Sequence, residues 1–302
     1  MIRKKHNKIK ISRGERIFDI FNVSFMFALM LVMVYPVWYV LVASFSESNS
    51  LMGYSGLLLM PKGFSFASYK MMAQNPMVLK GYINTIYIVV MQLVFNLVLT
   101  SLGAYFLSRK NVFWQKYVMI FIIITMYVNG GMIPTYLVNT KFYGLNNSYW
   151  ALILPGAIST YNMIVLKTGF MSIPDSLIEA ARIDGASQTK VLFRVVLPLA
   201  KATLAVITLY YAVAHWNSWF PASIYLTDRT KYPLQLVLRE ILIGNDTSSM
   251  TSGNIDANSD QQAIGETIKY ATIVVATLPI LCVYPYLQKY FAKGTMVGAV
   301  KE

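Results

Sequence analysis

The residues best suited to bind a polar ligand lie in an aromatic and polar cluster between residues 210 and 220. Tyr211, His215 and Trp219 recur at intervals of four, so a continuous helix would place them on one face. Aromatic rings can stack on the apolar faces of a small ligand while polar groups bond to its hydroxyls. The same pattern is typical of an aromatic belt at a membrane surface or of simple packing, and both alternatives stay open. Two further candidates of this segment are Trp216 and Asn217.

Polar residues inside two other apolar segments are further candidates. Asn129 is followed by Gly130-Gly131, where a broken helix could line a wet cavity or where glycine could allow close helix packing. Asn84, Gln92 and Asn96 fall on roughly one helical face. For this second group we expect hydrogen bonds to neighbouring segments.

Other kinds of chemistry are poorly represented. The single cysteine is Cys282 and the two histidines are His6 and His215, which excludes an intrachain disulfide and a thiolate or histidine-rich metal cage. The central parts of the long apolar segments hold no Asp, Glu, Lys or Arg, and no phosphate-binding glycine loop occurs. We therefore expect no catalytic residue and no cofactor in this chain, and any uphill transport would draw its energy from another polypeptide.

The elements that position these residues are membrane helices. The chain has 302 residues, of which 56% are hydrophobic and 13% are charged, about half the charge of a soluble domain. The net charge of +13 fits the excess of Lys and Arg in cytoplasmic loops better than a nucleic-acid surface. We expect six spans, at about 20–44, 82–107, 117–138, 148–169, 201–226 and 270–288.

The basic residues predict the topology. Most of them lie in the N-tail, the loop 108–116, the stretch 167–201 and the C-tail, so both termini are expected in the cytoplasm. The predicted organisation is a basic N-tail at 1–19, a six-helix domain at 20–290 with an inner loop 171–200 and a polar outer loop 227–269, and a C-tail at 291–302. Within the outer loop, apolar residues at helical spacing between 234 and 242 predict a short amphipathic helix on the outer surface.

The inner loop predicts two short helices joined by a tight turn. Ser172 and Ser187 suit helix N-caps, and Gly185 suits the left-handed residue that ends a helix. Ala180 and Ala181 are small, so the surface of another protein could approach the backbone closely.

This loop resembles the EAA motif of binding-protein-dependent ATP-binding-cassette (ABC) importers. The motif is Glu-Ala-Ala, three residues, Gly, nine residues and Ile-x-Leu-Pro, and Val195 is the one departure from it. The tail from Tyr290 to Lys301 and the stretch 129–136 resemble carbohydrate permeases of the maltose-permease type and their complex-oligosaccharide subgroup. The matching residues are Glu179, Ala180, Ala181, Gly185, Leu197 and Pro198.

The resemblance implies an all-α, six-span type I permease in the bacterial cytoplasmic membrane. Its partners would be a cytoplasmic ATPase dimer that binds ATP and Mg²⁺, a second six-span permease from a different gene, an extracytoplasmic sugar-binding protein, and membrane lipid. The cargo would be a sugar or oligosaccharide, including uronides and plant-polysaccharide fragments. Arg182 and Asp184 would join the EAA residues in ATPase coupling. Residues of the outer loop that would contact the binding protein are Asn245, Asp246, Asn254 and Asp256.

Three alternatives remain at this stage. The same importer could carry another solute, because the EAA motif does not distinguish cargo. A self-sufficient carrier or channel would need a coupling-ion site that the spans lack. A membrane-embedded enzyme would need converging Asp, Glu, His or Cys side chains, which the spans also lack.

Overall fold

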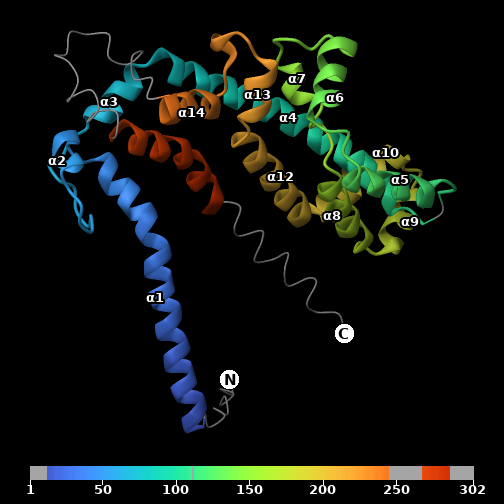
Figure 1. The fold of residues 1–302 in the computed structure, drawn as a ribbon. Coiled ribbons are helices and arrows are strands. Elements are labelled where there is room, and N and C mark those ends of the chain that lie inside the picture. The colour runs from blue at the N-terminus through green and yellow to red at the C-terminus, as the bar shows by residue number, and fades with distance from the viewer. Residues whose placement is uncertain (1–11, 111, 245–266, 286–302) are drawn as a thin grey trace. The chain divides into compact units, whose positions relative to one another are not determined.

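The computed structural model describes residues 12–110, 112–244 and 267–285, and most of these residues are helical. They contain no strand, only an isolated antiparallel bridge between Ser46 and Phe64. The chain divides into two compact units, one of residues 1–71 with 253–274 and one of 72–252 with 275–302. The helices are α1 (Arg13–Ser44), α2 (Ser48–Met52), α3 (Ala67–Gln74), α4 (Pro76–Ser108), α5 (Gln115–Tyr127), α6 (Met132–Leu137), η1 (Val138–Phe142), α7 (Trp150–Ile153), α8 (Thr160–Met171), α9 (Asp175–Ile183), α10 (Gln188–Val191), η2 (Leu192–Val196), α11 (Leu197–Leu199), α12 (Lys201–Trp216), α13 (Phe220–Tyr225), η3 (Arg229–Lys231), α14 (Leu234–Gly244) and the helix Thr267–Pro285 (Figure 1).

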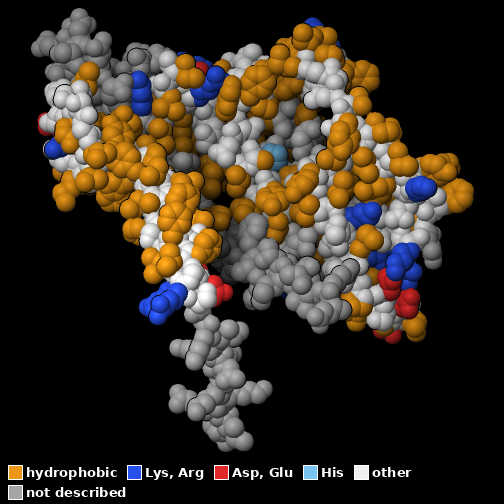
Figure 2. Space-filling view, turned by 60° about the horizontal axis from the view of Figure 1, so that its bottom comes forward, with side chains coloured by type: hydrophobic (Ala, Val, Ile, Leu, Met, Phe, Trp, Pro, Cys, Tyr) orange, Lys and Arg blue, Asp and Glu red, His pale blue; other side chains and the backbone are white. Residues whose placement is uncertain are grey.

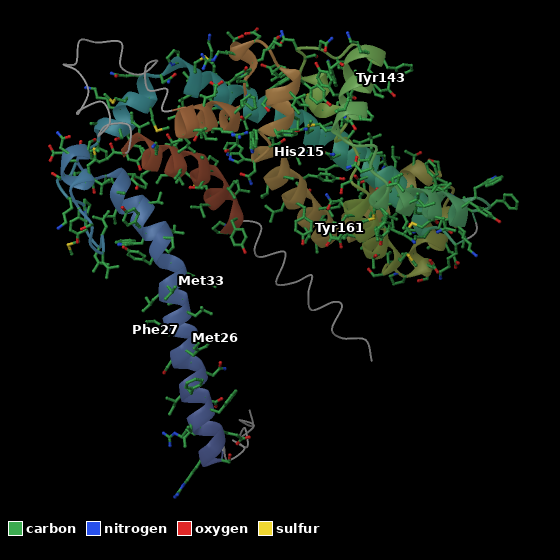
Figure 3. The ribbon with its side chains drawn as sticks, viewed as in Figure 1. Met26, Phe27, Met33, Tyr143, Tyr161 and His215 are labelled. Atoms are coloured by element: carbon green, nitrogen blue, oxygen red, sulfur yellow. The ribbon has the colours of Figure 1, made fainter. Side chains whose placement is uncertain are left out.

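In the first unit, α1 is a long apolar helix. It begins at a capping box in which Ser12 accepts from the backbone of Glu15 and the Glu15 carboxylate accepts from the backbone of Ser12. Its side chains stay exposed over most of its length, including Met26, Phe27 and Met33 (Figure 3). Exposed apolar surface on this scale requires lipid or another protein around it. Hydrophobic side chains cover much of the face that Figure 2 shows.

In the second unit, α4 is the central helix. Asn75 caps its N-terminus by accepting from Met77 N at 2.8 Å, and Pro76 occupies the first turn. The helix packs against α8, α12, α14, α7 and α5. Two of these contacts need a small residue on α4: a Cβ at Gly81 would lie 3.1 Å from Leu234 Cα, and one at Gly103 would lie 2.6 Å from Met163 Sδ. Small residues are typical of close helix packing in membranes.

The six predicted spans are only partly found as helices. Three helices are long and apolar enough to cross a membrane: Arg13–Ser44, Pro76–Ser108 and Thr267–Pro285. Two bent pairs, 115–127 with 132–142 (113°) and 188–199 with 201–216 (86°), raise the number to five if each pair is one span. The fourth predicted span, at 148–169, is not one continuous helix, because the chain breaks between α7 and α8 at Pro155-Gly156.

The amphipathic helix predicted at 234–242 is present as α14. Leu234, Val237, Leu238 and Ile241 are buried, because α14 packs its apolar face against α4. Its first backbone N–H, at Leu234, donates to Thr85 Oγ1 of α4 at 2.8 Å.

Candidate functional site

The inner loop forms the predicted helix–turn–helix, as α9 followed by α10. Pro174, and not Ser172, is the N-cap of α9, while Ser187 caps α10 as predicted by accepting from Lys190 N. The Ser172 hydroxyl instead donates to the carbonyl of Gly169 at 2.8 Å, at the end of α8, and does not cap α9. Asp175 stands in the first turn of α9, where the helix dipole favours a negative charge.

Gly185 makes the turn. Its φ of +75° lies in the left-handed region, as the sequence predicts. The N–H of Ala186 donates to Ala181 O at 3.0 Å and the N–H of Gly185 donates to Arg182 O at 2.9 Å. This pair of hydrogen bonds is a Schellman motif, which satisfies the last carbonyls of α9 and reverses the chain.

The two faces of α9 differ. Ile178 is buried and Ala181 packs against the same apolar core as α8, α10 and η2. The opposite face presents Ala180 and Ile183 to the outside, and Ile183 is 86% exposed. An exposed isoleucine beside a small residue forms an apolar surface that is open to another protein.

Leu197 and Pro198 lie where the loop turns into α12. They belong to α11, which continues α10 and the π-helical turn η2. Leu197 packs against the core and Pro198 is exposed. The helical axis then bends by 86° into α12, because proline and a π-turn both interrupt the regular hydrogen-bond ladder.

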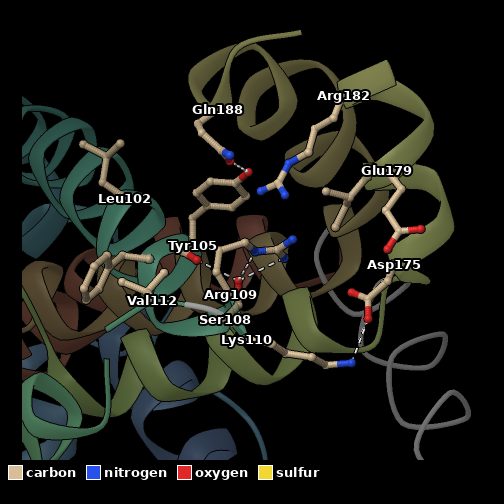
Figure 4. Close-up of a pocket in the computed structure, with 12 residues that line it drawn as sticks. Leu102, Tyr105, Ser108, Arg109, Lys110, Val112, Asp175, Glu179, Arg182 and Gln188 are labelled. Carbon is tan, nitrogen blue, oxygen red and sulfur yellow. Dashed lines mark hydrogen bonds and ion pairs between the residues drawn. The ribbon is translucent and has the colours of Figure 1, made fainter. Parts of the chain in front are cut away.

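A cleft of about 580 Å³ separates α9 from the end of α4 (Figure 4). Lys110 and Asp175 form an ion pair at 2.7 Å on one side of it. The hydrogen bond from Lys110 holds the pKa of Asp175 below its usual value. Further in, Tyr105 is buried and donates its hydroxyl to Gln188 Oε1 at 2.8 Å.

Sequence reasoning missed this cleft. The loop 108–116, which contains Arg109 and Lys110, predicted only the topology, although basic residues directly after an apolar span can also mark a polar site. Their approach to α9 depends on how α4 and α8 pack, and spacing along the chain does not reveal that.

Tyr211 and His215 lie together on α12, where Tyr211 is buried and His215 is half-buried. Their rings stack at 6.0 Å. The buried Tyr211 hydroxyl lies 2.7 Å from Thr100 Oγ1 and accepts from Ser159 N at 3.0 Å. His215 Nε2 lies 2.8 Å from Asn96 Oδ1, and Figure 3 shows its place on the helix.

The predicted shared face of Tyr211, His215 and Trp219 is wrong for Trp219. Helix α12 ends at Trp216, with the exposed Asn217 as its C-cap. The chain then restarts as α13, and Pro221 in its first turn suits a new helix start. Trp219 instead stacks under the guanidinium of Arg239, whose Cζ lies 3.3 Å from the ring centroid.

The other predicted site residues lie apart from these. Trp216 donates Nε1–H to Ala276 O at 3.1 Å. Asn129 is exposed and accepts from Gly131 N at 2.9 Å, in the break between α5 and α6. A Cβ at Gly130 would meet nothing within 4 Å, so the glycines do not serve close packing within the described chain. Asn245, Asp246, Asn254 and Asp256 lie outside the described residues.

The polar side chains of α4 bond to neighbouring segments, as predicted. Asn84 Nδ2 donates to the carbonyls of Thr230 and Tyr232, at 2.9 and 3.0 Å. Gln92 donates to Leu152 O at 2.8 Å and Asn96 to Gly156 O at 2.7 Å.

In the part of the chain that the structure describes, no group of His, Cys, Asp and Glu side chains could hold a metal ion.

Comparison with known proteins gives one consistent result. Residues 12–297 match the family model "Binding-protein-dependent transport system inner membrane component". The polygalacturonan/rhamnogalacturonan transport system permease protein YtcP of Bacillus subtilis (strain 168) is 40% identical over 95% of this chain and 99% of its own length. Protein LplC of the same organism is 40% identical over 96% of this chain and 97% of its own.

A solved structure has the same fold. A chain from a bacterial ABC transporter involved in the import of the acidic polysaccharide alginate matches with a TM-score of 0.84 and 31% identity. The match covers 94% of this chain and 100% of that chain.

Proposed function

This chain belongs to the family of binding-protein-dependent transport system inner membrane components, and from that premise we propose that it is the permease subunit of an oligosaccharide ABC importer. The relatives support an acidic cargo, because galacturonan fragments and alginate both carry uronate carboxylates. The observation that carries the proposal is the α9–Gly185–α10 turn, which presents Ala180 and Ile183 outward in the loop that matches the EAA motif.

The proposed topology is six spans with both termini in the cytoplasm. The three long helices, the bent pair 115–127 with 132–142, and α12 (the part of the second bent pair that follows the inner loop) would form five of them. The broken segment α7–α8 is the proposed fourth span in sequence. Asn96 and Gln92 of α4 bond to carbonyls in and beside this break, which makes a broken span tolerable in lipid.

The proposed mechanism transmits ATPase closure through α9. Ala180 and Ile183 would contact the ATPase, with Glu179 and Asp184 at the edge of the contact. Gly185 sets the direction of the chain after α9, and Ala181 holds α9 on the core. Leu197 and Pro198 would carry the movement into α12 through the 86° bend. ATP and Mg²⁺ would be bound by the ATPase.

Fewer residues can line the proposed sugar path than the sequence suggested. Tyr211 is buried and bonded to Thr100 and Ser159, so it would support the path and not line it. The exposed Asn129 and Asn217 and the half-buried His215, Trp216 and Trp219 remain candidates for contact with sugar. The partners would be a second permease, an ATPase dimer and an extracytoplasmic sugar-binding protein, which Asn245, Asp246, Asn254 and Asp256 would contact.

The test is affinity purification of this chain from its native membrane, followed by mass spectrometry and uptake assays. We expect an ATPase and a second permease to co-purify. In liposomes with the binding protein, the complex should take up galacturonate oligosaccharides only when ATP is present. Recovery of this chain alone, active in vesicles without ATP, would instead establish a self-sufficient carrier. ATP-driven uptake of a solute other than sugar would keep the importer and reject the cargo.

A further inference from the structure

Two arginine side chains converge on the cleft between α4 and α9. Arg109 follows α4 and Arg182 belongs to α9, and Figure 4 shows them pointing toward the same space beside Tyr105. The Cζ of Arg109 lies 4.8 Å from the centroid of the Tyr105 ring. Within the described residues, the guanidinium of Arg109 donates hydrogen bonds to the hydroxyl of its neighbour Ser108 and to no other group.

Neither guanidinium forms an ion pair with a carboxylate among the described residues, although the charge of Arg109 also acts on Asp175. The ion pairs there are Lys110 with Asp175 and Arg229 with Glu240. Lys110 therefore neutralises Asp175, and the remaining charges that line the cleft are two arginines and Glu179. Two convergent, unpaired guanidinium groups favour an anion with several oxygen acceptors, because each fork can bind two of them.

Arg182 points away from the surface proposed for the ATPase. It follows the buried Ile178 by four residues and so shares the face of α9 that looks toward α4. Ala180 and Ile183 lie on the other side. An anion bound by Arg182 would therefore occupy the space behind α9, where a docked ATPase would not need to displace it.

The cleft lies at the level expected for lipid headgroups. Arg109 follows directly on the apolar part of α4, which ends at Ser108. The next segment exposes three aromatic residues in mutual contact, Phe113 (86% exposed), Trp114 (60%) and Tyr117 (64%). Exposed tryptophan and tyrosine beside basic residues are typical of a membrane–water interface.

We propose that this cleft binds the phosphate group of an anionic phospholipid, held by Arg109 and Arg182 with Tyr105 and Gln188 as neighbours. The inference rests on the proposed function for the side of the membrane, which would be the cytoplasmic leaflet. Basic pockets between membrane helices on that side suit such headgroups. The bound lipid fixes the distance between α4 and α9, so it sets how α9 responds to the ATPase.

The experiment measures lipid retention. The complex is purified from its native membrane, exchanged into nanodiscs that contain phosphatidylglycerol and phosphatidylcholine, extracted in mild detergent and analysed by native mass spectrometry. The wild type should retain about one phosphatidylglycerol per copy of this chain. The double variant Arg109→Gln/Arg182→Gln should retain at least fivefold less. Arg182→Gln alone, an exposed site with little risk to folding, should retain at least threefold less.

The matched control is Arg194→Gln, an exposed arginine of the same loop that does not line the cleft. It should retain as much phosphatidylglycerol as the wild type. Equal retention by the double variant, or an equal loss in the control, would overturn the site. A second arm adds glycerol 3-phosphate to delipidated protein: binding of this soluble phosphate without retention of phosphatidylglycerol would overturn the lipid as its source.

The lipid measurement does not depend on the ATPase. A preparation that lacks the ATPase but retains phosphatidylglycerol would contradict the proposed function and support the lipid site. A preparation that contains the ATPase but retains no phosphatidylglycerol would support the proposed function and contradict the lipid site.

Discussion

Gly185 and Gly144 have nearly the same backbone, with φ of +75° and +65°, and an added Cβ meets nothing within 4 Å at either. They therefore form a matched pair in which a substitution introduces equal local strain. Only Gly185 lies beside the face of α9 that presents Ala180 and Ile183. Comparing substitutions at the two residues therefore separates the strain of a side chain on a left-handed backbone from an effect on ATPase docking.

We predict that Gly185→Asp releases the ATPase while the chain still inserts in the membrane. The left-handed conformation costs a side chain about 1–2 kcal/mol, and the new carboxylate adds charge to an apolar contact. Gly144→Asp should carry the same strain and keep the ATPase. Co-purified ATPase is quantified for both variants against the amount of this chain. Wild-type amounts of ATPase with Gly185→Asp would remove Gly185 from the interface.

At the scale of the helix, α4 organises its neighbours through polar side chains. Asn96 bonds to both Gly156 O and His215, whereas Gln92 bonds to Leu152 O alone and leaves its buried Oε1 without a partner. A buried oxygen without a hydrogen-bond partner lowers the stability of the folded protein. Replacing Gln92 with an apolar residue would lose its one hydrogen bond but would also remove this unfavourable oxygen, so the two effects would partly cancel.

We predict that Asn96→Leu destabilises the protein more than Gln92→Leu. The first change should lower the free energy of unfolding by about 1–2 kcal/mol, and the second by less than about 1 kcal/mol. Thermal unfolding in one detergent gives the order of the two variants. A larger effect at Gln92 would mean that its free oxygen has a partner, such as a buried water, in the native protein.

At the scale of the whole molecule, the prediction concerns the side of the membrane on which each loop lies. In a Cys282→Ser background, Thr189→Cys tests the proposed inner loop and Thr227→Cys tests the proposed outer region; both sites are exposed. An impermeant maleimide should label Thr227→Cys in intact cells and Thr189→Cys only after permeabilisation. Labelling of both in intact cells would contradict a membrane crossing between residues 189 and 227.

The sequence was sufficient where the structure depends on neighbouring residues. Gly185 took the left-handed turn and Ser187 capped α10 as predicted, because turns and caps are set by side chains within a few residues. The apolar segments at α1, α4 and Thr267–Pro285 appeared as long helices, because lipid requires every backbone group to bond within its own segment. The family also followed from a local motif.

Only the tertiary structure decided how segments far apart in the chain meet. The break at Pro155-Gly156 and the end of α12 at Trp216 interrupt apolar runs, and polar side chains of α4 satisfy carbonyls in and beside the first break. Arg109 and Arg182 line one cleft because α4 packs against α8, with Gly103 beside Met163. Hydrophobicity along a sequence specifies that a segment leaves water, for lipid or for the protein interior, but the shapes of the facing side chains select its partner.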